Sequence, residues 1–85
     1  MDQFIGEEVV IDVEALFVYV GKLTDVAEKT ITLVDADVHD LRDSNTTRER
    51  YVLDTKTDGV RSNRKKVLIS RPQILSLSLL KDVMD

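Results

Sequence analysis

The feature that most constrains the fold is an alternation of apolar and polar residues that runs from position 9 to position 37 and includes Gly21. At its start the odd positions are apolar, whereas Asp12 and Glu14 are charged. Because successive side chains of a strand point to opposite faces, this pattern predicts a half-buried strand at residues 8–14. A glycine inside such a pattern marks a bend or a close approach of two backbones.

Further strands are predicted along the chain, at residues 17–26, 30–39, 65–70 and 74–80. Only a few residues separate the first three strands, which favours an antiparallel meander over a parallel sheet with helical crossovers. Pro72 cannot donate to a ladder, so it ends the fourth strand or lies in the turn that follows. In the last strand we expect Leu75, Leu77 and Leu79 on one face and the two intervening serines on the other.

The middle of the chain, residues 40–64, breaks the alternation and is predicted to be an insertion on the sheet. Thr46 and Glu49 have the spacing of a capping box, which favours a short helix at residues 47–58. The competing interpretation is a strand at residues 51–55, because tyrosine, valine and threonine favour strands there.

The length of 85 residues predicts a single domain, residues 1–85, with a thin core that favours support from subunit contacts. The absence of cysteine excludes disulfides, thiolate zinc sites and a cysteine nucleophile. The longest apolar run, residues 15–20, is far short of the roughly 20 residues of a membrane span, and residues 1–3 lack the basic start of a secretory signal. We therefore expect a cytoplasmic protein without a membrane partner.

Charge is unevenly distributed along the sequence. The net charge is −4, but residues 1–41 carry −8 and residues 42–71 carry +5. A net negative chain repels nucleic acid in general, yet a basic segment can dock phosphates if folding gathers it on one face. Charge alone leaves the class of partner open.

The order and spacing of these motifs resemble the Sm-like family, whose small barrels assemble into rings. The matching motifs are Val9-x-Ile11-x-Val13, Tyr19-Val20-Gly21-Lys22-Leu23, Leu33-Val34-Asp35-Ala36 and Val67-Leu68-Ile69-Ser70-Arg71-Pro72-Gln73-Ile74. The resemblance implies a mainly all-β fold, in which five antiparallel strands form a strongly bent sheet and a small open barrel. The insertion at residues 40–64, as a short helix or loop between strands three and four, is longer than the family's loop.

The departures from the family bear on function. The aspartate and asparagine that hold a uracil base in the family are absent, because only Asp25 and Thr30 lie near those places. The arginine-glycine of the second motif is replaced by Ser70-Arg71, with Gln73 where an asparagine is common. A shift of one residue along a strand turns a side chain to the opposite face, so Arg71 is a candidate only if the turn at Pro72 redirects it inward.

The resemblance and the basic segment together predict single-stranded RNA as a partner, bound through a basic rim or pore with weak base preference. The candidate contacts are Lys29, Arg61, Asn63, Arg64, Lys65, Lys66, Arg71 and Gln73. The alternative for the run at residues 61–66 is a solvated loop that protects an edge strand from aggregation. Phe17 and Tyr19 are expected in the core rather than as stacking platforms.

A homo-oligomeric ring of five to seven copies is the predicted assembly, with residues 65–70 of one copy paired to residues 74–79 of the next. The candidate interface residues are Val67, Ile69, Leu75 and Leu77. The alternative function is a non-catalytic scaffold ring that binds protein partners and has lost the RNA base pocket.

Catalytic and metal chemistry have little support in the sequence. Asp35, Asp37 and His39 alternate along one strand, but acids at a strand end are ordinarily solvated or accept backbone hydrogen bonds. His39 is the one histidine, and no serine stands beside it in an elbow or triad pattern. We therefore expect no metal, no cofactor and no enzyme activity.

Overall fold

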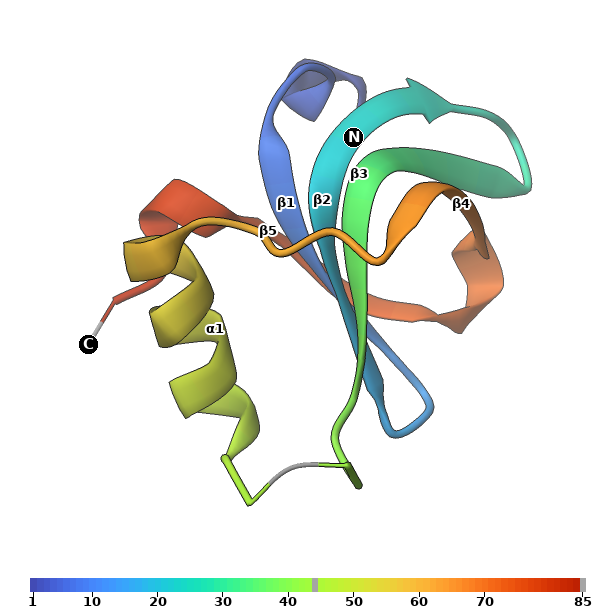
Figure 1. Cartoon of the computed structure of the whole chain (residues 1–85). Coiled ribbons are helices and arrows are strands. Elements are labelled where there is room, and N and C mark those ends of the chain that lie inside the picture. Colours follow the sequence, from blue (N-terminus) through green and yellow to red (C-terminus); the bar gives the residue numbers. More distant parts are fainter. Residues whose placement is uncertain (44, 85) are drawn as a thin grey trace.

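The architecture is a five-stranded antiparallel sheet with strand order β4-β3-β2-β1-β5 and one α-helix between β3 and β4 (Figure 1). The computed structural model describes residues 1–43 and 45–84; Ser44, within the predicted insertion, and Asp85 fall outside them. The strands are β1 (Glu8–Val13), β2 (Phe17–Val26), β3 (Thr30–Asp40), β4 (Arg64–Ser70) and β5 (Ile74–Leu79). The helix α1 is Arg48–Asp58, and the 3₁₀ turns are η1 (Asp2–Phe4), η2 (Arg71–Gln73) and η3 (Leu80–Asp82). The predicted fold class is confirmed.

The sheet bends sharply where β2 passes β3, and both strands are visibly curved in Figure 1. A Cβ on Gly21 would lie 2.8 Å from Ala36 Cβ and 3.0 Å from Ala36 Cα, so only glycine fits without a shift. Val20 of β2 lies opposite Asp37 of β3, and Lys22 lies opposite Val34. One residue of β2 therefore lies opposite two residues of β3, so β3 has a bulge. Asp35 occupies that bulge with φ of 48°, a left-handed conformation. The predicted bend at Gly21 is therefore present, and it depends on a bulge in the neighbouring strand.

The concave side of the bent sheet encloses the main core, which we call the barrel interior. Its buried members are Val9, Ile11, Val13, Leu23, Ile31, Leu33, Ala36 and Ile69. Phe17 and Tyr19 pack against this cluster, as predicted, and η1 contributes Phe4 from the N-terminal end. The apolar positions of the first three strands thus pack against one another on this side of the sheet.

The opposite side of β1 and β2 is covered as well, and we call it the helix-covered face. Its buried members are Val10, Val18, Val20, Val52 and Leu80, the last two from α1 and η3. β1 is therefore apolar on both sides at its centre, where Val10 is 3% exposed. The prediction of a half-buried first strand is wrong there, because the helix removes the second face from solvent.

Residues 48–58 form a helix, so the strand alternative for residues 51–55 is wrong. The cap is Thr47, whose side-chain oxygen accepts a hydrogen bond from the Arg50 backbone N–H at 3.2 Å. The N-cap is therefore one residue later than the spacing of Thr46 and Glu49 predicted, since Thr47 directly precedes the first helical residue. At the other end the Gly59 N–H donates to the Thr55 carbonyl at 2.8 Å.

A bulge in the pairing of β1 with β5 changes the faces of β5. Ser76 lies opposite Asp12 and Ile74 lies opposite Val13, which leaves Leu75 without a residue across from it. Ile74 consequently points into the barrel interior with Leu77 and Leu79, whereas Leu75 is 64% exposed. The expectation that Leu75 shares a face with Leu77 and Leu79 is wrong, because the extra residue shifts the alternation.

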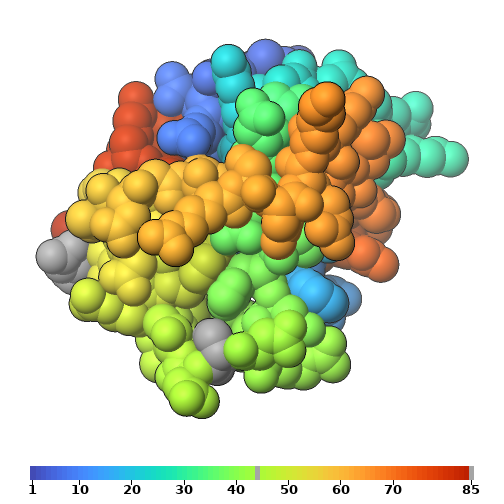
Figure 2. All heavy atoms as spheres, viewed as in Figure 1, coloured from blue at the N-terminus to red at the C-terminus, as the bar shows by residue number. Residues whose placement is uncertain are grey.

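The two outer strands of the sheet have open edges. Within residues 1–43 and 45–84, β4 pairs with β3 alone and β5 pairs with β1 alone. Figure 2 shows the segment from the end of α1 through β4 crossing the front of the molecule with no other segment over it. No helix among the described residues is long and apolar enough to cross a membrane.

Candidate nucleic-acid interface

One end of the sheet brings together the β2–β3 connection and the turn η2. The Arg71 backbone N–H donates to the Lys29 carbonyl at 2.9 Å, and Arg71 Nη1 donates to the Ala27 carbonyl at 2.8 Å. Thr30 and Ser70 are the last paired residues of β3 and β4 here. We call Lys29, Arg71 and Gln73 the loop cluster.

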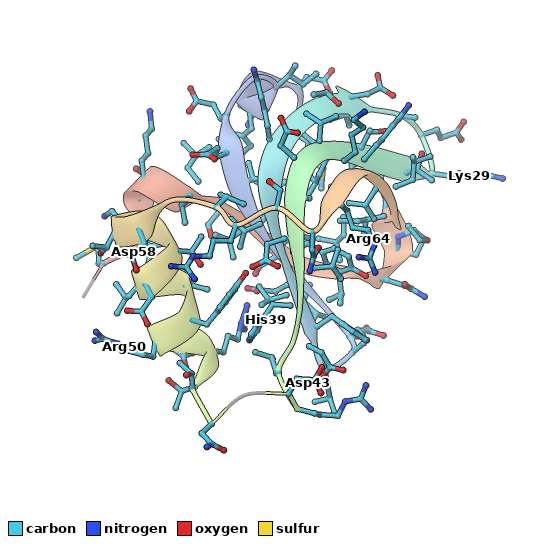
Figure 3. The ribbon with its side chains drawn as sticks, viewed as in Figure 1. Lys29, His39, Asp43, Arg50, Asp58 and Arg64 are labelled. Atoms are coloured by element: carbon cyan, nitrogen blue, oxygen red, sulfur yellow. The ribbon has the colours of Figure 1, made fainter. Side chains whose placement is uncertain are left out.

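The loop cluster leaves cationic donors accessible. The Lys29 side chain is exposed and projects from the tip of the connection, away from the body of the molecule (Figure 3). Pro72 lies within η2, and the Arg71 guanidinium turns toward the β2–β3 connection rather than continuing along β4. A guanidinium has five N–H donors, so one bond to Ala27 leaves others for a phosphate. Arg71 thus orders the connection and still carries its charge at this end.

The remaining candidate cations lie toward the opposite end of β4. We call Arg61, Arg64, Lys65 and Lys66 the β4 basic run, and all four are exposed. β4 extends from Arg64 to Ser70, so its two ends are separated by about 20 Å if the strand is straight. The predicted RNA contacts therefore form two groups, not one.

Asn63 has a structural role that the sequence did not reveal. Its Oδ1 accepts from the Val38 N–H at 2.9 Å and its Nδ2 donates to the Val38 carbonyl at 3.0 Å. Its own backbone N–H donates to the Ala36 carbonyl at 2.9 Å. The side-chain amide extends the β3–β4 pairing beyond the strand, which gives Asn63 a structural role in the sheet.

Three other bases of the +5 segment are neutralised by acids. Arg42 pairs with Asp40 at 2.8 Å, Arg50 pairs with Asp54 at 3.2 Å, and Arg48 pairs with Asp12. Hydrogen bonds from Arg42 lower the pKa of the Asp40 carboxyl to about 2. These ion pairs reduce the net positive charge that the segment presents, because folding places the three arginines beside carboxylates.

The candidate interface residues occupy different positions. Ile69 is 4% exposed in the barrel interior, and Val67 and Leu77 pack against the same cluster at the open edges. Leu75 is in the bulge and faces solvent. Three of the four predicted interface residues thus extend the barrel interior to the sheet borders.

Two polar residues of β3, Asp37 and His39, contact the helix through Tyr51. Asp37 accepts a hydrogen bond from the Tyr51 hydroxyl, and His39 stacks on the Tyr51 ring with centroids 3.8 Å apart and planes 7° from parallel. Burial, and then this bond, raise the pKa of Tyr51. Asp35 is in the bulge, so the three polar residues do not share a face. The described part of the chain contains no group of three or more histidine, aspartate or glutamate residues placed to hold a metal ion.

A hollow of about 260 Å³ lies between α1 and β3, lined by Asp37, Tyr51, Asp54, Thr55, Asp58, Gly59 and Arg61. Sequence reasoning missed it, as it missed the pairs that join α1 to the sheet. Arg48 pairs with Asp12, whose Oδ2 also accepts from Ser76 Oγ at 2.6 Å. These partners are distant in sequence, so no short-range spacing could have indicated them.

No protein-family model matches the sequence, and no curated protein is significantly similar to it. Among solved structures, the chain is similar to the Sm protein of Pyrococcus abyssii, determined in complex with a uridine heptamer. The TM-score is 0.62 and the sequence identity is 18%, over 92% of this chain and 89% of that chain. The chain therefore has an Sm-like fold, as its motifs predicted.

Proposed function

We propose that this chain is the subunit of an Sm-like ring that binds single-stranded RNA and performs no catalysis. The observation that carries the proposal is the loop cluster, in which two connections of the sheet are hydrogen-bonded together and present Lys29 and Arg71. The likeness of the fold to an Sm protein that was solved with a uridine heptamer supports it.

The ring rests on the two open edges. β4 of one copy would pair with β5 of the next, giving both strands the backbone partners that they lack among the described residues. Val67 and Ile69 would then continue the barrel interior across the contact toward Leu77 of the neighbour. Head-to-tail pairing of identical edges closes into a ring when the rotation divides a full turn, and we propose five to seven copies.

RNA would be held mainly through its phosphates. Lys29 and Arg71 supply charge, and Gln73 supplies an exposed amide from the same turn as Arg71. Phe17 and Tyr19 pack against the barrel interior and are partly buried, so we expect no base to stack on them. The β4 basic run would give a second contact at the other end of the strand. Binding through phosphates predicts similar affinity for different bases.

Fluorescence anisotropy with labelled oligo-U and oligo-A, at low and moderate salt, tests this function. Lys29→Ala is expected to weaken binding of both oligonucleotides by roughly three- to tenfold and to reduce the salt slope by about 1 per contact. Lys81→Ala is the matched control, because this exposed lysine lies 3.8 Å from Glu7, away from the loop cluster. Absence of binding at low salt by the unmodified protein would end the RNA proposal.

A scaffold ring that binds protein is the second candidate, and the pairing of Arg42, Arg48 and Arg50 with acids favours it. Those pairs leave much of the surface acidic, which repels nucleic acid. Affinity capture with the intact protein, followed by analysis of both protein and nucleic acid, separates the two functions. Recovery of nucleic acid without any protein partner counts against the scaffold.

A further inference from the structure

A second groove lies on the helix-covered face, beside the open edge of β5. It has a volume of about 210 Å³, and its walls include Val10, Asp12, Val52, Ser78, Val83 and Met84. Ser78 is paired with Val10 of β1 and is exposed, so the groove begins at the border of the sheet. Its lining is more apolar than that of the hollow between α1 and β3.

Bonds within one chain hold the walls of the groove in place. Arg48 at the start of α1 pairs with Asp12, and Ser76 Oγ donates to the same carboxylate at 2.6 Å. Near the other end of α1, Lys56 Nζ donates to the Val83 carbonyl and ties the C-terminal segment to the helix. Polar bonds therefore hold both α1 and the C-terminal segment, which form two walls of the groove.

A strand added to β5 would place alternate side chains next to Ser76 and Ser78, on the side where the groove lies. The open edge of β4 presents two such side chains on the corresponding face. Leu68 lies opposite Thr32 and Lys66 lies opposite Val34, which puts both on the outer side of the sheet. Leu68 is 59% exposed on an edge strand, where a large aliphatic side chain invites pairing.

We infer that Leu68 of a neighbouring copy seats in the groove between α1 and β5, so that α1 forms a side wall of the subunit contact. Met84, which is 85% exposed in the free chain, provides apolar surface for the leucine, and Val10 and Val52 line the groove with little exposed surface of their own. Glu49 leaves negative charge on the wall once Arg48 and Asp12 are paired, which complements Lys66 of the incoming strand. This inference rests on the proposed ring and names the second layer of its contact.

The occupant is a second copy of this chain because that copy satisfies backbone, apolar and charged groups together. Pairing of β4 with β5 of the next copy gives hydrogen-bond partners to the backbone groups at both open edges. The same pairing brings Leu68 to the groove. The inner layer of Val67, Ile69 and Leu77 closes the barrel interior, whereas the outer layer depends on the helix. A strand with a polar residue at the position of Leu68 would leave the groove unfilled.

Cross-linking tests the seating directly, because the chain contains no cysteine. The double variant Leu68→Cys, Met84→Cys is treated with a short bismaleimide and run on a denaturing gel, after light scattering has confirmed assembly. A ladder of covalent multimers is expected. Leu16→Cys, Met84→Cys is the matched control, since Leu16 is 53% exposed in the connection between β1 and β2 and is expected to give no ladder.

A second measurement does not depend on cysteines. Leu68→Ser is expected to raise the dissociation constant of the assembly by roughly tenfold or more, while Leu16→Ser leaves it unchanged. Because both leucines are exposed, neither variant should lower the melting temperature of the free chain. A ring without a ladder, in which Leu68→Ser assembles as well as Leu16→Ser, overturns the inference but leaves the ring standing. A monomeric unmodified protein overturns both.

Discussion

The barrel interior and the helix-covered face lie on opposite sides of the same strands, yet they are held together differently. The barrel interior is lined by aliphatic side chains from β1, β2, β3 and β4. The helix-covered face has an apolar centre at Val10, Val18 and Val20, surrounded by the polar contacts of Arg48 and Tyr51. One side therefore depends on packing, and the other depends on specific partners around a small apolar patch.

This difference has a physical origin in α1. The helix sequence is largely polar, and only Val52 and Thr55 are buried. So little apolar burial gives a helix weak attachment, because packing of an amphipathic face supplies most helix stability in proteins. Ion pairs and hydrogen bonds to β1 and β3 supply the remaining attachment. The helix-covered face should thus respond to pH and salt, whereas the barrel interior should not.

The largest expected effect is in the barrel interior. Leu33→Ala is expected to lower the free energy of unfolding by about 3 kcal/mol, because it leaves a cavity at a side chain that is 0% exposed. Leu16→Ala is the matched control, with 53% exposure and an expected change within about 0.5 kcal/mol. Urea unfolding followed by circular dichroism measures both. Equal losses for the two variants would contradict the assigned core.

A smaller loss is expected where β2 passes β3. Gly21→Ala places a Cβ 2.8 Å from Ala36 Cβ and should cost about 1–3 kcal/mol of overpacking. Adding Ala36→Gly should recover part of that loss, because the closest atom is removed while Ala36 Cα and the Val34 carbonyl remain near. A double-mutant cycle from denaturant unfolding measures the recovery. Strict additivity would show that the two residues do not meet.

Tyr51→Phe is expected to cost about 1–2 kcal/mol at neutral pH, because it removes a hydrogen bond to the Asp37 carboxylate. The pKa of Tyr51 is raised above its usual 10, so the fold favours the neutral phenol. Its contribution is full below about pH 10 and is lost as pH rises through the pKa of the folded state. The variant should therefore lose less stability than the unmodified protein above that pH.

Melting temperatures at several alkaline pH values measure this dependence. Tyr19→Phe is the control, since it removes the chain's other tyrosine hydroxyl and leaves Tyr51 in place. The Tyr19→Phe variant should still lose stability at alkaline pH, as the unmodified protein does. A Tyr51→Phe protein that follows the unmodified protein throughout would show that the hydroxyl does not couple the helix to β3.

The smallest expected effect is at the start of α1. Arg48→Ala should cost about 1 kcal/mol at low salt, and less at high salt, because the Arg48 and Asp12 side chains are 32% and 23% exposed and partly screened. Arg50→Ala is the matched control, because its pair with Asp54 lies within the helix at 68% and 49% exposure. Thermal unfolding at two salt concentrations tests whether only the Arg48 variant loses stability in a salt-dependent way.

The candidate site shows where sequence reasoning reached its limit. The sequence placed Lys29 between two predicted strands, and it placed Arg71 in the turn around Pro72. The role of Asn63 did not follow, because its side chain bonds to the backbone of Val38 on another strand. The pairing of Arg48 with Asp12 was equally invisible, since each residue alone is typical of a solvated surface.

The sequence by itself determined the strands, the insertion and the bend at Gly21, because alternation and glycine act through local backbone geometry. The tertiary structure alone decided the faces of Asp35 and Leu75, since each bulge exists only in relation to the neighbouring strand. It also decided that α1 buries Val10 and that the positive segment is divided between two ends of β4. The reason is that periodicity is a property of one segment, whereas register, bulges and ion pairs are properties of two.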